Sequence, residues 1–139
     1  MTRFVLDASV ALAWIIDHPV PTFARRVRDR LLRGDRAVVP PLWHLEVANG
    51  LLVAERRRLL TALDTGLALQ QIEHFIAQAA ETDTSAISLR EAHTLGRAHG
   101  LSAYDAVYLA MAGNLHLPIA TLDKALVAAA RKARVPVLS

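Results

Sequence analysis

Four acidic residues stand at places where a carboxylate is unusual. Two follow short apolar runs, one lies in the first turn of an apolar helical stretch, and one lies in a helical stretch with mostly apolar neighbours. In chain order they are Asp7, Glu46, Asp105 and Asp123, separated by 39, 59 and 18 residues. If the fold brings them together, their charges repel one another unless a hard cation neutralises them. Oxygen ligands in a chain without cysteine favour Mg²⁺ or Mn²⁺.

Each acid also has a structural explanation when it is taken alone. Asp7 and Asp123 could cap the helices that follow their apolar runs, because Asp is a favoured N-cap residue. Asp105 could complete a capping box with Ser102 in "LSAYDAV". Glu46, in "PLWHLEVANGLL", is harder to explain, because a buried carboxylate must be paired, protonated or bound to a cation. Taken together, the four acids favour a shared site.

Short apolar runs and longer helical patterns alternate along the chain. We expect strands over 3–7, 37–40, 117–123 and 135–138, a short extended piece between 81 and 85, and helices over 8–17, 21–33, 42–57, 62–79, 85–100, 102–112 and 124–133. This alternation predicts an α/β sandwich with a largely parallel central sheet. Ligands of such sheets bind beyond the carboxyl ends of the strands, where Asp7 and Asp123 are expected.

Length and composition limit the class of protein. A chain of 139 residues with 53% hydrophobic residues suffices for one buried core, so we expect a single domain over 1–139. No run of eighteen uncharged apolar residues occurs, and "MTRFVLDASV" lacks the pattern of a signal peptide, so we expect a soluble, cytoplasmic protein with no membrane partner. The absence of cysteine excludes disulfides and thiolate metal sites.

Arginine residues cluster in two segments. The first holds Arg25, Arg26, Arg28, Arg30, Arg33 and Arg36, and the second holds Arg56, Arg57 and Arg58. Guanidinium groups match the geometry of phosphates, so these segments could bind a polyanion. A solvated helix surface explains the same clusters equally well.

The four acidic segments, taken in order, resemble the motifs of a known family. "VLDASVALAW", "PPLWHLEVANGL", "LSAYDAVYLAMA" and "PIATLDKAL" are similar in order and approximate spacing to the acidic motifs of the PIN domain. The chain length is similar to that of the VapC toxins of bacterial toxin–antitoxin pairs. The resemblance covers essentially the whole chain. It implies a three-layer α/β/α sandwich that cleaves RNA with Mg²⁺ or Mn²⁺ and leaves a 5′-phosphate and a 3′-hydroxyl.

The resemblance also implies roles for individual residues. Asp7, Asp105 and Asp123 would be metal ligands, directly or through water, and Glu46 would be a ligand or the base that orients the attacking water. Thr121 and Ser9 would be supporting hydroxyls. For Asn49, one turn from Glu46, a supporting role and simple packing remain equally good explanations.

The partners implied by the resemblance are a second copy and an antitoxin. We expect a homodimer that uses apolar helix faces near 51–60 and 86–95. A VapB-type antitoxin is expected to place its C-terminal segment in a groove near Trp14 and Trp43 and to point a basic residue at the acids.

Other functions fit parts of the pattern. A PIN-like module that binds RNA or protein without cutting does not need the intact acids that this chain has. A phosphatase of the haloacid-dehalogenase type also uses acids at strand ends, but it needs an acid where this chain has Ser9. The six histidines show no HxH or HExxH spacing, which disfavours a zinc site. We expect core or interface positions for the large aromatic residues Trp14, Trp43, Tyr104 and Tyr108.

Overall fold

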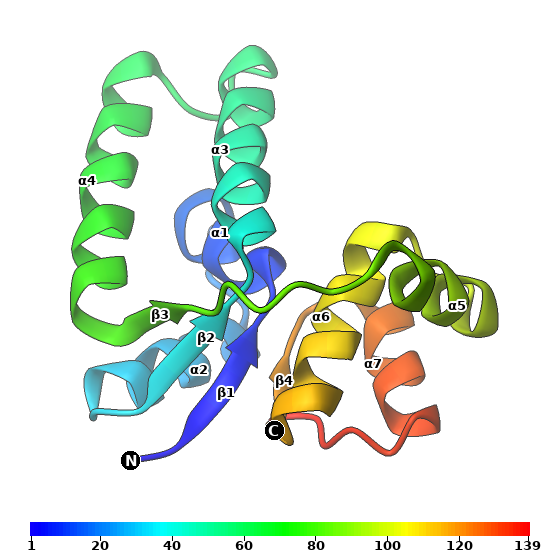
Figure 1. The fold of residues 1–139 in the computed structure, drawn as a ribbon. Coiled ribbons are helices and arrows are strands. Elements are labelled where there is room, and N and C mark those ends of the chain that lie inside the picture. The colour runs from blue at the N-terminus through cyan, green and yellow to red at the C-terminus, as the bar shows by residue number, and fades with distance from the viewer.

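Four short parallel strands form the centre of the fold (Figure 1). The structure is a computed structural model and describes residues 1–139. The strands are β1 Arg3–Leu6, β2 Arg36–Val39, β3 Ala80–Thr82 and β4 Ile119–Ala120, in the order β3-β2-β1-β4. All three pairings are parallel. β1, β2 and β4 read as apolar runs because helices cover a parallel sheet on both faces, whereas the edge strand β3 is partly polar.

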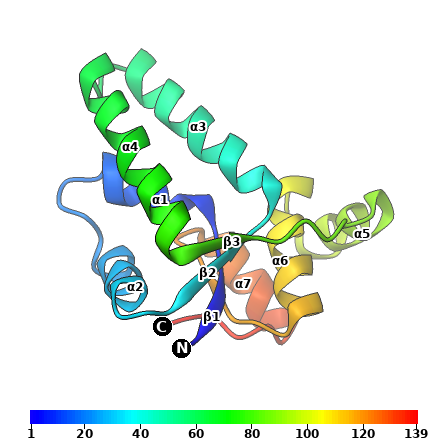
Figure 2. The ribbon, with the colours of Figure 1, turned by 60° about the vertical axis from the view of Figure 1, so that its left-hand side comes forward.

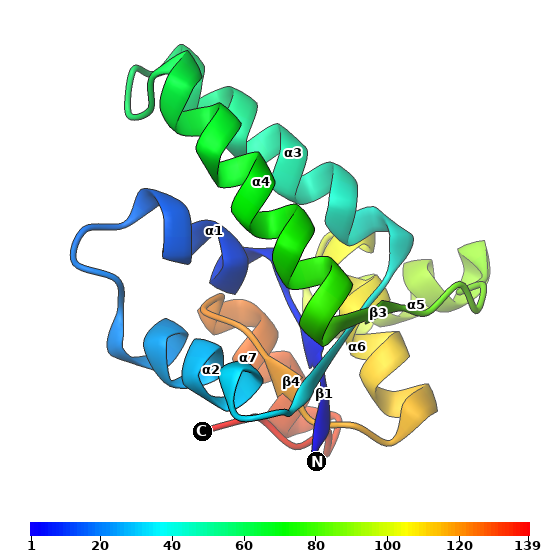
Figure 3. The same ribbon diagram turned by 90° about the vertical axis from the view of Figure 1, so that its left-hand side faces the viewer.

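Seven helices surround this sheet. They are α1 Ala8–Ile16, α2 Thr22–Leu32, α3 Pro41–Arg56, α4 Ala62–Ala79, α5 Leu89–His99, α6 Ala103–Leu115 and α7 Lys124–Lys132. Figure 3 shows α1 and α2 on one side of the sheet and α5 and α6 on the other. The predicted three-layer α/β/α sandwich is therefore confirmed. None of these helices combines the length and the apolar character that crossing a membrane requires.

The helices differ in how much of their surface is buried. Helix α6 packs against β1 and β4, and its apolar sequence is buried on most sides. Helices α3 and α4 run antiparallel and project beyond the sheet as a pair (Figures 1 and 2). A single core cluster of 31 buried residues joins the strands to the helices. Its largest side chains include Trp43, Tyr108 and Phe4.

Two of the clustered arginines are part of the fold. The Arg30 guanidinium lies over the Phe4 ring, 5.9 Å from its centre, and its Nε donates to Asp35 at 3.0 Å. Arg36 donates from Nη1 to the carbonyl of Gln78 at 3.0 Å. Arg25 and Arg26 on α2, and Arg33 directly after it, are instead exposed. Only part of the first arginine segment is therefore free to meet a polyanion.

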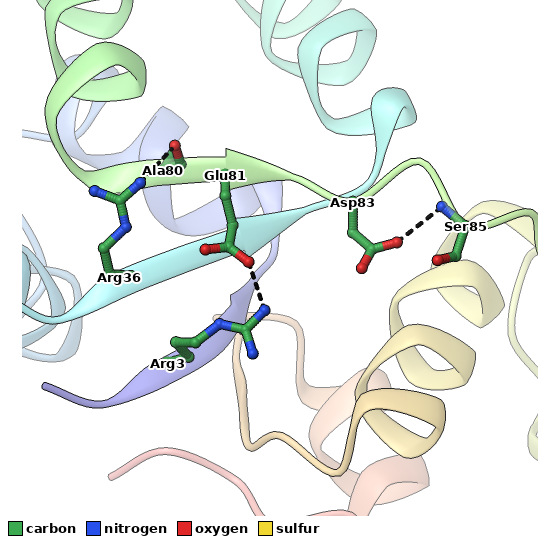
Figure 4. Close-up of polar contacts among 6 residues, drawn as sticks. All are labelled: Arg3, Arg36, Ala80, Glu81, Asp83 and Ser85. Atoms are coloured by element: carbon green, nitrogen blue, oxygen red, sulfur yellow. Dashed lines mark hydrogen bonds and ion pairs between the residues drawn. The ribbon is translucent and has the colours of Figure 1, made fainter.

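A charged pair links the two strands that flank β2. Arg3 on β1 donates from Nη2 to Glu81 Oε1 on β3 at 2.5 Å, and Figure 4 shows this pair spanning β2, with Arg36 beside Ala80. Both side chains are about two-fifths exposed, at 39% and 40%. Because water screens such a pair, we expect it to contribute little to the stability of the sheet.

Three expected boundaries were wrong for local reasons. Helix α5 begins at Leu89 rather than near 85, because Ser88 caps it by accepting from the Glu91 N–H at 3.0 Å. In the segment before it, Asp83 accepts a hydrogen bond from the Ser85 N–H at 2.8 Å (Figure 4). The expected strand 135–138 is a single bridge between Val137 and Ile119, because the neighbouring proline has no N–H to donate. The expected strand 117–123 shrinks to Ile119–Ala120.

Candidate active site

The sheet register places Asp7 next to Thr121. Leu6 pairs with Ala120, so the residues that follow β1 and β4 leave the sheet side by side. The Asp7 N–H donates to the Ala120 carbonyl at 2.9 Å. Because β2 lies on one side of β1 and β4 on the other, chain order reverses at this point. Crevices at such reversals are the usual ligand sites of parallel α/β sheets.

Asp7 occupies the N-cap position of α1 but does not cap the helix. Its side chain makes no capping hydrogen bond. Oδ2 instead accepts from Ser9 Oγ at 2.6 Å and from Thr121 Oγ1 at 2.7 Å. Asp7 is 5% exposed and Thr121 4%, and the other buried side chains are apolar or aromatic. The capping explanation therefore fails for Asp7, and two neutral hydroxyls hold its buried carboxylate.

Asp123 does cap the helix that it precedes. Its Oδ1 accepts from the Ala125 N–H at 2.8 Å and from the Leu126 N–H at 3.2 Å. Its own N–H donates to Thr121 Oγ1 at 3.0 Å. The Leu122 N–H donates to Ser9 Oγ at 3.1 Å. The two hydroxyls that hold Asp7 therefore also fix the loop that carries Asp123.

Asp105 forms only half of the expected capping box. Ser102 Oγ accepts from the Asp105 N–H at 3.1 Å, but the Asp105 carboxylate does not return a bond to the Ser102 N–H. Helix α4 shows the complete motif, in which Thr61 and Asp64 bond each other in both directions. The Asp105 carboxylate is therefore not used up at the start of its helix.

Glu46 reaches the same region from α3. Its Oε1 accepts from the Tyr108 hydroxyl of α6 at 2.5 Å. The close approach of α3 to α1 depends on Gly50, where a Cβ atom would lie 2.6 Å from the Leu12 side chain. A residue without a side chain therefore lets α3 bring Glu46 up to the start of α1.

One cavity of about 340 Å³ collects these residues. All four acids line it, together with Ala8, Ser9, Leu12, Asn49 and Gly50. Thr121 lies behind Asp7, as its hydrogen bond shows. No histidine lines the cavity, in agreement with the absence of histidine metal motifs. Four carboxylates from four separate helices or their caps thus face one small space.

Burial and repulsion between neighbouring carboxylates raise the pKa values of Asp7, Glu46 and Asp105. Burial raises the pKa of Asp7 above its ordinary value, the hydrogen bonds from Ser9 and Thr121 offset part of this, and repulsion from Asp123 adds to it. Burial raises the pKa of Glu46, the hydrogen bond from Tyr108 offsets part of that rise, and repulsion from Asp7 and Asp105 increases it. Burial raises the pKa of Asp105, and repulsion from Asp7 and Asp123 increases it. The cavity is therefore short of positive charge.

The carboxylates do not form a closed metal cage. No group of three or more His, Asp or Glu side chains is arranged so that it could hold a metal ion by itself. An ion in this cavity would need water molecules to complete its coordination. Mg²⁺ commonly keeps several of its waters, so an all-oxygen cavity of this kind fits it.

Sequence reasoning missed the role of Tyr108. We expected a core or interface residue, and Tyr108 is indeed buried, but its hydroxyl contacts Glu46. The signal was its position three residues after Asp105, which places both on one face of a helix. Tyr104 was expected in the core or at an interface and is 63% exposed in the chain.

Similarity to known proteins agrees with this geometry. The model of the family described as the PIN domain matches residues 4–132. The chain belongs to the PIN-domain family. This PIN domain is 35% identical over 124 residues to ribonuclease VapC3 of Pyrobaculum aerophilum, across 89% of this chain and 92% of that protein.

A solved structure shares the fold of this PIN domain. The crystal structure of PAE2754, also from Pyrobaculum aerophilum, matches with a TM-score of 0.69 over 92% of this chain and 84% of that one. The two sequences are 21% identical, so this likeness supports the fold alone.

Proposed function

We propose that this PIN domain is a divalent-metal-dependent endoribonuclease and the toxin of a toxin–antitoxin pair. The observation that carries the proposal is the gathering of Asp7, Glu46, Asp105 and Asp123 in one cavity at the sheet's reversal point. The similarity to a protein named ribonuclease VapC3 supports RNA as the substrate. An RNA-cleaving toxin acts in the cytoplasm, where we expect this one.

The donor set fits Mg²⁺ or Mn²⁺. The cavity offers carboxylate and amide oxygens, which are the ligands that a hard cation prefers, and it offers no sulfur or imidazole. Asp7, Asp105 and Asp123 would hold the ion, directly or through water. These carboxylates repel one another, and a bound cation would neutralise their negative charge. Ser9 and Thr121 would keep Asp7 in place, and Asn49 lies at the rim.

Hydrolysis of RNA needs a nucleophile and a protonated leaving group. The oxygen of a water molecule forms a bond to phosphorus, the bond from phosphorus to the 3′ oxygen breaks, and the 3′ oxygen takes up a proton. A bound divalent cation supplies charge neutralisation at the phosphate and lowers the pKa of the water. Glu46 either helps to hold the cation or accepts the proton that the water loses, a role for which its raised pKa is suited.

The test is a cleavage assay on the purified full chain with an end-labelled RNA. We expect cleavage with Mg²⁺ or Mn²⁺ and none with a chelator. Changes to residues that only hydrogen-bond a metal ligand typically cost about 10- to 100-fold in activity. Asp7→Asn should lower kcat by more than that, because it changes a proposed ligand. Asp17→Asn is the matched control, because Asp17 is exposed and lies outside the cavity. RNA binding without cleavage at any metal concentration would favour the non-catalytic binding module instead.

A second cavity supports an antitoxin as partner. It is apolar, has a volume of about 570 Å³ and lies between α1, α2 and α4. Trp14 and Phe75 line it and pack edge to face at 5.3 Å, and the Trp14 indole N–H donates to the Ala24 carbonyl at 2.8 Å. Trp43 is buried against Phe75 and does not line it. We propose that the C-terminal segment of a VapB-type antitoxin fills this cavity and directs a basic residue to the acids.

The antitoxin proposal predicts a division of roles between the two cavities. Asp7→Asn should abolish cleavage and keep the antitoxin complex, because the apolar cavity holds the partner. Trp14→Ala should weaken the complex while cleavage persists. Both variants are measured by pull-down with the protein encoded next to this gene and by the RNA assay. A complex lost in a folded Asp7→Asn variant would contradict this division.

A further inference from the structure

The Tyr108 hydroxyl is a buried polar group that donates to Glu46, one of the acids of the cavity. Tyr108 lies on α6 and is fully buried, yet its hydroxyl approaches Glu46 Oε1 of α3 to 2.5 Å. The two residues are 62 positions apart in sequence. This hydrogen bond therefore depends on the tertiary fold and connects two of the helices that carry the acids.

The direction of this hydrogen bond follows from chemistry. An ionised carboxylate has no proton to give, so the phenol donates and Glu46 accepts. It is the one hydrogen bond that the Glu46 side chain makes within the protein. Oε1 is therefore engaged by Tyr108, and Oε2 is the oxygen that remains without a protein partner.

Asp7 shows the same arrangement on the other side of the cavity. Ser9 and Thr121 both donate to Oδ2 of Asp7, and neither hydroxyl contacts Oδ1. Each of these carboxylates has one oxygen held by neutral hydroxyl donors. Neutral donors fix the orientation of a carboxylate without cancelling the negative charge that a cation needs. Carboxylates that bind metal are commonly oriented by such outer hydrogen bonds.

We propose that Tyr108 is a positioning residue that fixes the Glu46 carboxylate so that Oε2 alone faces the cation or the attacking water. The inference rests on the proposed metal-dependent function and names a further part of that site. Because Asp105 and Tyr108 share one face of α6, the same helix supplies one acid and orients another. Loss of the hydroxyl leaves the ring and its packing in place and frees the Glu46 side chain to rotate.

The test compares Tyr108→Phe with Tyr104→Phe in the full chain. Both changes remove one hydroxyl from the same helix, but Tyr104 is 63% exposed and does not line the acidic cavity. Mn²⁺ binding is measured by the loss of the free-ion signal in electron paramagnetic resonance. We expect Tyr108→Phe to weaken Mn²⁺ binding by about 10- to 100-fold and Tyr104→Phe to leave it unchanged. In the RNA assay, kcat should fall while KM for RNA stays constant, and added Mn²⁺ should restore part of the loss.

A second variant keeps the proposal testable if Tyr108→Phe folds poorly. Glu46→Asp keeps the charge and shortens the side chain, so its carboxylate no longer reaches Tyr108. It should reproduce the loss of Mn²⁺ affinity.

Two results would overturn the role of Tyr108. Unchanged Mn²⁺ affinity in folded Tyr108→Phe, with only a lower melting temperature, would make Tyr108 a packing residue and leave the proposed function intact. Failure of the wild-type chain to bind Mn²⁺ would overturn the metal site and the role of Tyr108 together.

Discussion

The buried pair of Asp7 and Thr121 stands inside an otherwise apolar interior, so its presence has a cost for folding. A buried carboxylate is tolerated when hydrogen bonds compensate part of its lost hydration. Here Ser9 and Thr121 supply two such bonds, and the pKa of Asp7 is still raised. The fold therefore keeps a charge that destabilises the metal-free protein, which is typical of a functional site.

We predict that Asp7→Asn stabilises the metal-free protein at neutral pH. The folded-state pKa of Asp7 lies above its unfolded value, so the folded state binds more protons between the two values. Its contribution to stability is complete below the unfolded pKa and is lost as pH rises through the folded one. Asparagine removes the charge and can still accept the two hydroxyl hydrogen bonds through its amide oxygen.

The measurement is the melting temperature against pH in a chelator. Asp35, Asp64 and Asp83 have lowered pKa values and give the opposite slope in both proteins, so taking the difference between Asp7→Asn and the wild type removes their contribution. This difference should grow as pH rises from 4 toward 7, by about a few tenths of a kcal/mol or more. Mn²⁺ should then raise the melting temperature of the wild type more than that of the variant. A variant that melts lower than the wild type at pH 7 would contradict the assignment.

At the residue scale, the sequence predicted which acids share the cavity but not how each is held. Their types and order were visible, since each follows an apolar run or interrupts an apolar helix. Capping was a sound explanation for Asp123 and an incorrect one for Asp7, because the alternative partners of Asp7 come from residue 121. The contact of Tyr108 with Glu46 was missed for the same reason, because the two residues are distant in sequence.

Helix α6 separates a structural role from a proposed functional one within a single turn. Ser102 caps the helix by accepting from the Asp105 N–H, whereas the Asp105 carboxylate returns no capping bond. We predict that Ser102→Ala lowers the free energy of unfolding by about 0.5–2 kcal/mol. Asp105→Asn should not lower it in the absence of metal, because burial and neighbouring acids already disfavour the charge.

Urea denaturation of both variants in a chelator tests this separation. Thr61→Ala is the control, because it removes a cap from a complete capping box outside the cavity. A loss of stability in Asp105→Asn equal to that in Ser102→Ala would show that Asp105 acts mainly as part of the helix start.

At the element scale, long periodic helices were predicted better than short strands. Helix α4 has the expected bounds of 62–79, because eighteen residues of pattern and a strong cap determine it. Strand β4 has two residues, and its expected partner at 135–138 is reduced to a single bridge. Whether such short segments form strands depends on the strands that pair with them, which the local sequence does not specify. The turn at Asp83 likewise depends on one side chain bonding the backbone two residues later.

The whole molecule presents chemically different surfaces. An acidic cavity lies at the sheet's reversal point, and an apolar cavity lies between α1, α2 and α4. Exposed arginines on α2 contribute to a formal net charge of +3. RNA carries the charge that these arginines attract, while an acidic cavity without a cation repels phosphate. The proposed cation therefore reconciles an acidic centre with a polyanionic substrate.

Assembly is the remaining prediction at this scale, and it concerns the projecting pair of α3 and α4 (Figure 2). Large apolar side chains are exposed on this pair and on the turn that joins its helices, among them Leu52 on α3 and Leu59 in the turn. Leu89, at the start of α5, is also exposed and lies in the second expected interface segment. Contiguous exposed apolar residues commonly mark protein contacts. We predict a homodimer that covers Leu52 and Leu59 and places two acidic cavities in one particle.

Sedimentation velocity over a concentration series tests this assembly. The wild type should sediment as a dimer, and the double change Leu52→Glu with Leu59→Glu should shift it to the monomer, because two buried charges without partners cost more than an interface of ordinary size supplies. Leu32→Glu is the matched control, since Leu32 is also an exposed leucine but lies on α2. A wild-type chain that stays monomeric at every concentration would contradict the dimer. A dimer that survives the double change and dissociates in Leu32→Glu would instead place the interface beside the apolar cavity, where it would compete with the antitoxin segment.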